Sequence, residues 1–109
     1  MGAASFQFPH ACTAWRKGTE GRTATWRRVS LPSCRFEPTY GASAGERGDD
    51  SQRSADLLVK CRNKPLSRGD RVALGTIDAD TPPADALTVS TLAMISLGAS
   101  PHHWEIGLV

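Results

Sequence analysis

The chain has 109 residues, of which 39% are apolar and 22% charged, and this length and composition predict a single domain over residues 1–109. Thirteen Lys and Arg against eleven Asp and Glu give a formal net charge of +2, which is too balanced to indicate a nucleic-acid partner by itself. No segment approaches the roughly 18 apolar residues of a membrane span, and residues 1–8 lack the apolar run of a signal peptide. We therefore expect a soluble protein that is made in the cytoplasm and has no membrane partner.

The first third of the chain predicts extended structure. Residues 10–16 follow Pro9 and show no helical period, and residues 23–31 alternate between their two faces. Lys17 to Gly21 predict the turn of a β-hairpin between these two strands. Pro32 predicts a break in the chain before a third extended segment at residues 34–40.

Residues 41–54 contain no large apolar side chain, so this segment cannot contribute to a core and predicts a long flexible loop. Long polar loops on a rigid scaffold often contact a partner, although a loop without any role is an equally simple interpretation. The charged residues of the loop, which are candidates for contacts with a channel or a partner, are Glu46, Arg47, Asp49, Asp50 and Arg53.

Further strands are predicted in the second half of the chain. Residues 55–62 carry the strongest buried-strand pattern, and a turn at residues 66–70 leads into a short strand at 71–74. Residues 87–97 are rich in β-branched and hydroxyl side chains and favour a strand over a helix, with one helical turn at 82–86 as an option. A last strand is predicted at residues 103–109. About six short strands indicate an all-β fold, a small antiparallel β-barrel or sandwich.

Neither the cysteines nor the histidines form a recognisable site. Cys12, Cys34 and Cys61 are odd in number and widely spaced, which excludes a zinc knuckle and favours buried, reduced thiols. His102 and His103 are adjacent, and adjacent side chains on a strand point to opposite faces, so they cannot easily share a metal ion. No catalytic motif is present, and we expect no enzyme activity, no metal and no cofactor.

Three tryptophans are candidate core or interface anchors, namely Trp15, Trp26 and Trp104. Trp15 and Trp26 lie in a stretch with an excess of basic residues between positions 16 and 28. We interpret this stretch as a solvated strand face or the rim of an interface. The alternative is a stacking platform for single-stranded nucleic acid, in which aromatic and basic side chains alternate. The tripeptide at residues 68–70 matches cell-adhesion ligands, but a turn at this place also needs glycine and aspartate.

The order of several segments carries a resemblance to a known group of proteins. These segments are residues 8–13, 56–59, 66–75, 82–89 and 98–106, and the resemblance covers roughly residues 8 to 107. Its most specific element is His103-Trp104-Glu105 near the end, whereas the Gly69-Asp70 turn taken alone is weak. In this order the segments resemble the small minor structural proteins that long-tailed bacteriophages of Gram-positive hosts encode after the major capsid protein.

That group is similar in strand layout to the head–tail joining proteins, also called head-closure or stopper proteins. The resemblance implies a non-enzymatic β-barrel in the virion, which forms a ring of identical copies between the portal or adaptor and the tail. It also implies that residues 41–54 face the channel, where packaged DNA passes without specific contacts. A tail-completion or capsid-associated role fits the same resemblance.

Overall fold

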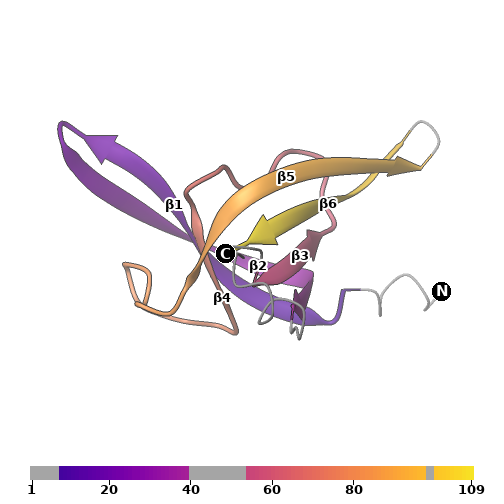
Figure 1. The fold of residues 1–109 in the computed structure, drawn as a ribbon, viewed down its shortest axis with the longest axis horizontal. Helices are drawn as coiled ribbons and strands as arrows, with labels where there is room; N and C mark the ends of the chain where they lie inside the picture. The colour runs from indigo at the N-terminus through magenta and orange to yellow at the C-terminus, as the bar shows by residue number, and fades with distance from the viewer. Residues whose placement is uncertain (1–7, 40–53, 98–99) are drawn as a thin grey trace, which may run out of the picture.

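The computed structural model describes residues 8–39, 54–97 and 100–109, and in this part of the chain all regular elements are β-strands. Six antiparallel strands form one closed barrel in the order β1-β2-β3-β6-β5-β4 (Figure 1). This confirms the prediction of a small all-β barrel. The strands are β1 (His10–Glu20), β2 (Thr23–Pro38), β3 (Ala55–Val59), β4 (Arg71–Leu74), β5 (Leu87–Leu97) and β6 (Ser100–Leu108).

The core follows from the alternation of side chains along the strands. In β3, residues 55, 57 and 59 are buried while 56 and 58 are half-buried on the outer face, as expected for a strand with one face inside a barrel. Trp15 is the largest fully buried side chain, with 0% of its surface exposed. The other fully buried large side chains are Leu57, Leu66, Ile106, Leu108, Val72, Val89, Cys12 and Cys34.

The β1–β2 hairpin is longer than predicted. Lys17 to Glu20 belong to β1, and the turn contains only Gly21 and Arg22, because Glu20 pairs with Thr23. Gly21 has a φ of +67°, as the first central residue of a two-residue hairpin turn requires. Gly18 is an ordinary strand residue opposite Thr25, so of the five residues predicted for the turn only Gly21 lies in it.

The predicted break at Pro32 is also wrong, since β2 runs through it as one strand of 16 residues. His10 pairs with Cys34 and Cys12 pairs with Leu31, so two residues of β2 face the single Ala11 of β1. This is a β-bulge, and it accommodates Pro32 because a bulge residue does not need to donate an N–H to the ladder. The bulge lets β2 bend from the β1 hairpin into the barrel wall.

The barrel closes at β4, its shortest strand. β4 pairs with β1 over four positions but with β5 only at Arg71–Thr88 and Val72–Leu87. The turn before β4 extends this short ladder, because Gly69 N–H donates to Val89 O at 3.0 Å and Val89 N–H donates to Asp70 O at 2.8 Å. Gly69 adopts a φ of +95°, which explains why the turn contains a glycine.

The Asp70 side chain connects this turn to β1. Asp70 is only 3% exposed, and each of its carboxylate oxygens accepts a hydrogen bond from a backbone N–H. Oδ1 accepts from Lys17 N–H at 2.9 Å, and Oδ2 accepts from Ser67 N–H at 2.8 Å. Hydrogen bonds to an ionised acceptor are stronger than neutral ones, so Asp70 fixes the position at which β1 leaves the barrel.

Residues 75–80 lie against the first half of β1 and are held there by polar contacts. The buried Thr13 hydroxyl donates to Gly75 O at 2.7 Å and accepts from Ile77 N–H at 3.0 Å. Trp15 Nε1 donates to Ala79 O at 2.9 Å. The segment therefore covers the end of the barrel above Trp15.

Predictions for the later segments are largely confirmed. Residues 87–97 form β5, which confirms a strand instead of a helix, and residues 83–86 form a turn in which Ala86 N–H donates to Pro83 O. The last strand begins at Ser100, earlier than predicted. Residues 40–53, which include all but the last residue of the predicted loop, lie outside the described residues. Ser54 is placed, and its N–H donates to Leu108 O at 2.6 Å.

Two hairpins extend from the barrel in opposite directions (Figure 1). β1 pairs with β4 only as far as Trp15, so residues 16–20 pair with β2 alone. β5 pairs with β4 only at its first two residues, and its remaining length pairs with β6 alone. Among the described residues, no third strand pairs with β1 beyond Trp15 or with β5 beyond Thr88, and only Lys17 and Val89 contact the Asp70 turn there.

Trp15→Ala should lower the free energy of unfolding by about 3–5 kcal/mol, because it leaves a large cavity and removes a buried hydrogen bond. Urea unfolding followed by circular dichroism measures the change. Trp26→Ala is the matched control, since Trp26 lies half-buried on the projecting hairpin, and it should cost about 1 kcal/mol or less. Equal losses for the two variants would contradict the placement of Trp15 in the core.

Asp70→Ala should lower the free energy of unfolding by about 1–3 kcal/mol, because two backbone N–H groups lose their acceptor. Asp80→Ala serves as the control, because the Asp80 side chain is 97% exposed, and it should change stability by about 0.5 kcal/mol or less. Hydrogen exchange adds a local readout, in which the Lys17 and Ser67 amides exchange faster in the Asp70 variant. Unchanged protection of both amides would contradict the role of Asp70.

Candidate assembly surfaces

The most basic surface of the described chain is the projecting end of the β1–β2 hairpin. We refer to residues 16–28 as the basic arm. All of them are exposed except the half-buried Trp26. The arm carries a single acidic residue, Glu20, and five basic residues, which are Arg16, Lys17, Arg22, Arg27 and Arg28.

The pairing register concentrates this charge at the root of the arm. Arg16 and Arg27 are directly opposite each other, and Lys17 is opposite Trp26. Like charges at directly opposed positions of an antiparallel pair are destabilising. A hollow of about 430 Å³ lies beside them, between the arm and the turn that contains Asp70. The root of the arm is thus a positively charged site with one aromatic ring.

Arg28 is held differently from the other basic residues of the arm. Its guanidinium donates a hydrogen bond to Asp78 O and lies 3.7 Å from the Asp80 carboxylate. The ion pair with an exposed aspartate contributes little to stability, but the carbonyl contact ties Arg28 to the segment above Trp15. Among the described residues, no ion pair involves Arg16, Lys17, Arg22 or Arg27.

A second surface, on the outer face of β2, β3, β6 and β5, is acidic. A hollow of about 350 Å³ lies there, and we refer to it as the acidic groove. Its three carboxylates come from Glu37, Asp56 and Glu105. Glu37 and Asp56 are directly opposite each other, and the next position across the sheet is Gly107, which has no side chain. The missing side chain explains why the sheet face is hollowed at this point.

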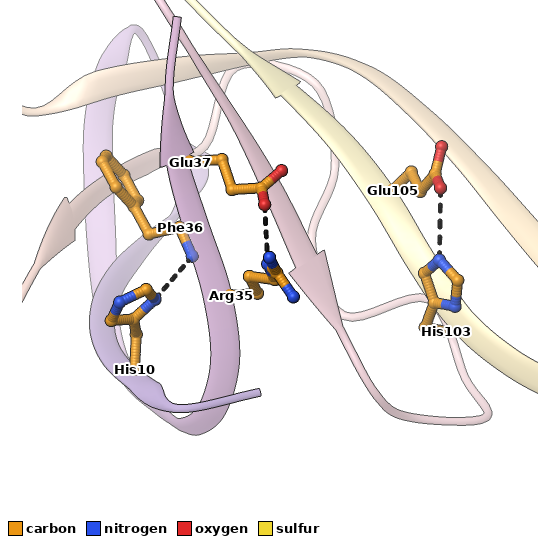
Figure 2. A network of polar contacts seen from close by, with 6 residues as sticks. All are labelled: His10, Arg35, Phe36, Glu37, His103 and Glu105. Carbon is orange, nitrogen blue, oxygen red and sulfur yellow. Dashed lines mark hydrogen bonds and ion pairs between the residues drawn. The ribbon is translucent and has the colours of Figure 1, made fainter. Parts of the chain in front are cut away.

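Two basic neighbours reach the carboxylates from beside the groove. Arg35 Nε lies 2.6 Å from Glu37 Oε2, and His103 Nε2 lies 3.2 Å from Glu105 Oε2 (Figure 2). His103 offsets a charge only when it is protonated. Among the described residues that line the groove itself, three are acidic and none is basic, so the hollow retains a negative character.

A third hollow, of about 490 Å³, lies between the bulge of β2 and the segment that follows β3. Leu31, Pro32 and Val59 give it an apolar floor, whereas Lys60, Arg62 and Lys64 line its rim. Trp104 Nε1 donates to Arg62 O at 3.4 Å beside it. Its charge has the same sign as that of the basic arm, so these two surfaces do not complement each other.

The structure separates the three tryptophans. Trp15 is inside the barrel, Trp104 is half-buried and packs against the core, and Trp26 lies on the basic arm. The burial of Trp15 removes one of the two rings of the nucleic-acid stacking platform. All five charged loop residues, Glu46, Arg47, Asp49, Asp50 and Arg53, lie outside the described residues.

The acidic groove was not among the sequence predictions. Its signal was present, because Glu37 and Asp56 occupy outward positions in strands that also carry the buried Cys34 and Leu57. However, bringing Glu37, Asp56 and Glu105 together requires the register between β2, β3 and β6, and β3 and β6 are far apart in the sequence. Strand alternation alone does not give that register.

The remaining candidate sites have structural roles. His10 Nδ1 accepts a hydrogen bond from Phe36 N–H at 2.9 Å, which makes this histidine part of the β1–β2 contact (Figure 2). Asp70 of the adhesion-like tripeptide is buried, and both of its carboxylate oxygens accept backbone hydrogen bonds. Among the residues that the structure describes, no three His, Cys, Asp or Glu side chains are placed so that they could hold a metal ion together. Within the same ranges, no helix is long and apolar enough to cross a membrane.

The cysteines differ in their access to solvent. Cys12 and Cys34 are buried in the core, and Cys61 is half-buried. A hydrogen bond with the Cys34 thiol and burial both raise the pKa of Cys12, so this thiol stays protonated at neutral pH. Desolvation also raises the pKa of Cys61.

In the native protein we expect only Cys61 to react with a thiol reagent, slowly, and at a rate that increases with pH because the thiolate is the reactive form. Mass spectrometry after labelling at pH 7 and pH 9 measures the sites and rates. Cys61→Ser should abolish labelling of the folded protein, while all remaining thiols react in denaturant. Labelling of Cys12 at the rate of Cys61 would show that the core is open.

Comparison with known proteins returned no match to any protein-family model, curated protein or solved structure.

Proposed function

We propose that this chain is a structural protein of a tailed bacteriophage, a head-closure subunit of the ring between the portal or adaptor and the tail. Its partners are copies of itself and the neck proteins above and below, and it performs no catalysis. The observation that carries this proposal is the barrel itself, a small closed barrel with two hairpins that extend in opposite directions (Figure 1). A closed wall provides rigidity, and the hairpins provide surfaces for neighbours.

The unpaired edges of the hairpins support an assembling role. Within the described ranges, β1 has an edge without a pairing strand beyond Lys17, and β5 has another beyond Val89. Exposed edges of this kind template contacts with other chains unless something covers them. Met94, 44% exposed, adds an apolar side chain to the β5 hairpin. Neighbouring subunits in a ring would cover both hairpins.

Two of the sequence segments that carry the resemblance lie in the turn that closes the barrel and in a strand beside the acidic groove. The segment around Gly69 and Asp70 forms the turn that closes the barrel, and His103 to Glu105 lie in β6 beside the acidic groove. One of these segments thus holds the barrel together, and the other offers side chains for contacts with neighbours. A tail-completion or capsid-associated protein with the same barrel remains the alternative, and location in the particle distinguishes the two.

A nucleic-acid-binding module is less well supported. With Trp15 in the core, Trp26 is the only tryptophan on the basic arm, and one ring does not stack a run of successive bases. The basic arm still fits non-specific contact with DNA phosphates. Such contact would accompany the ring role where DNA passes through the channel.

The experiment is a low-resolution reconstruction of purified particles in which this protein carries a bulky label at residue 1. We expect additional density arranged as a ring between portal and tail. A matched preparation that lacks the protein should yield heads and separate tails, because the joint cannot form. Label density spread over the capsid faces, or no label in the particle, would overturn the proposal. Heads that keep their tails without this protein would also overturn it.

A further inference from the structure

Four of the five basic residues of the basic arm, all but Arg28, form no ion pair with a carboxylate of the described residues. Arg16 and Arg27 face each other across the hairpin, and no described carboxylate forms an ion pair with either of them. Their repulsion is a cost that the isolated subunit bears. An anionic surface placed against this pair would remove the cost and add charge-assisted hydrogen bonds.

The acidic groove carries the opposite charge to the basic arm, and two of its carboxylates already have a basic neighbour, Arg35 beside Glu37 and His103 beside Glu105. Glu37 and Asp56 are directly opposite each other, and Glu105 lines the same hollow. The side chains of Glu37 and Glu105 are about half exposed, at 47% and 52%, so both can contact a partner. Guanidinium groups are suited to this site, because one guanidinium can donate two parallel hydrogen bonds to a carboxylate.

An arm cannot reach the groove of its own chain. β2 contributes Trp26 to the arm and Glu37 to the groove, and the intervening part of the strand spans roughly 35 Å at about 3.3 Å per residue. The arm also points away from the side of the barrel where β3 and β6 lie (Figure 1). Any contact between the two surfaces is therefore a contact between two copies.

We propose that the basic arm of one copy docks in the acidic groove of the next, with Arg16 and Arg27 against Glu37 and Glu105. This contact rests on the proposed function, in which it joins neighbouring subunits of the ring. The contact joins two different surfaces, so each copy keeps a free arm or a free groove for a further copy. Heterologous contacts of this type close into a ring when the rotation between subunits permits.

The shapes of the two surfaces agree with this contact. The groove spans four adjacent strands, which is a width of about 14 Å at roughly 4.8 Å between neighbours. The arm is a two-stranded ribbon, and its strands are about 5 Å apart. The ribbon is thus narrower than the sheet face that receives it. The hollow at Gly107 provides room for a long side chain of the arm.

A charge-swap experiment tests the contact directly. The arm variant is Arg16→Glu with Arg27→Glu, and the groove variant is Glu37→Lys with Glu105→Lys. A matched control, Lys60→Glu with Arg62→Glu, reverses two exposed charges at the third hollow. Sedimentation velocity over a range of protein concentrations, at low and high salt, measures self-association of the full chain. Circular dichroism and cooperative unfolding establish that each variant is folded.

We expect the unmodified chain and the control to associate, more strongly at low salt because the charges lie near solvent. Each swapped variant alone should associate at least about tenfold more weakly, since its two exchanged side chains then face side chains of their own sign. An equimolar mixture should regain association, because every contact then joins unlike surfaces.

Three results would overturn the contact: a chain that stays monomeric at low salt and high concentration, variants that associate as well as the unmodified chain, or a mixture that stays dissociated. If the arm variant loses only its binding to a DNA oligonucleotide, the arm contacts nucleic acid instead. Particles separate this inference from the proposed function. A normal neck ring built from the arm variant would refute the contact alone, whereas recovered association with no protein at the neck would refute the function alone.

Discussion

Closure of the barrel through the Asp70 turn is the constraint on which the other features depend. β4 is too short to hold β1 and β5 by its own ladder, and the backbone of Gly69 and Asp70 provides the missing hydrogen bonds to Val89. The Asp70 carboxylate then holds the Lys17 amide at the barrel rim. Burying a carboxylate is costly unless it is hydrogen-bonded, and here both oxygens accept backbone N–H groups. The same turn thus closes the barrel and fixes the place where the arm leaves it.

The fold class could be predicted because large apolar side chains alternate in parts of the barrel wall. Leu57 and Val59 in β3, and Ile106 and Leu108 in β6, are buried at every second position, and a period of two is the side-chain period of a strand with one buried face. The arm has no such pattern, because both of its faces meet solvent, so its length could not be read from alternation. Pro32 was misleading for a different reason. It sits in a bulge, and a bulge is defined by pairing with a second strand that is remote in the sequence.

The candidate surfaces differ in predictability in the same way. The basic arm is contiguous in the sequence, and its charge excess was visible as an interface rim. The acidic groove is assembled from β2, β3 and β6, so it exists only once the register places Glu37, Asp56 and Glu105 together. Its hollow depends on Gly107, which lacks a side chain where its neighbours across the sheet, Asp56 and then Glu37, carry carboxylates. The sequence around Gly107 does not show these neighbours. The sequence alone therefore predicts the basic arm, whereas the acidic groove is recognised only from the pairing of the strands.

The continuity of β2 through its bulge has a mechanical consequence. One uninterrupted strand begins in the basic arm and ends at the acidic groove, so both proposed contacts of a subunit are attached to the same length of backbone. In a closed assembly, tension between neighbours would pass along covalent bonds within each subunit and across charged contacts only between subunits. Such a ring behaves as a hoop whose weakest links are its joints. Outward pressure would then open it at a joint and leave the barrels folded.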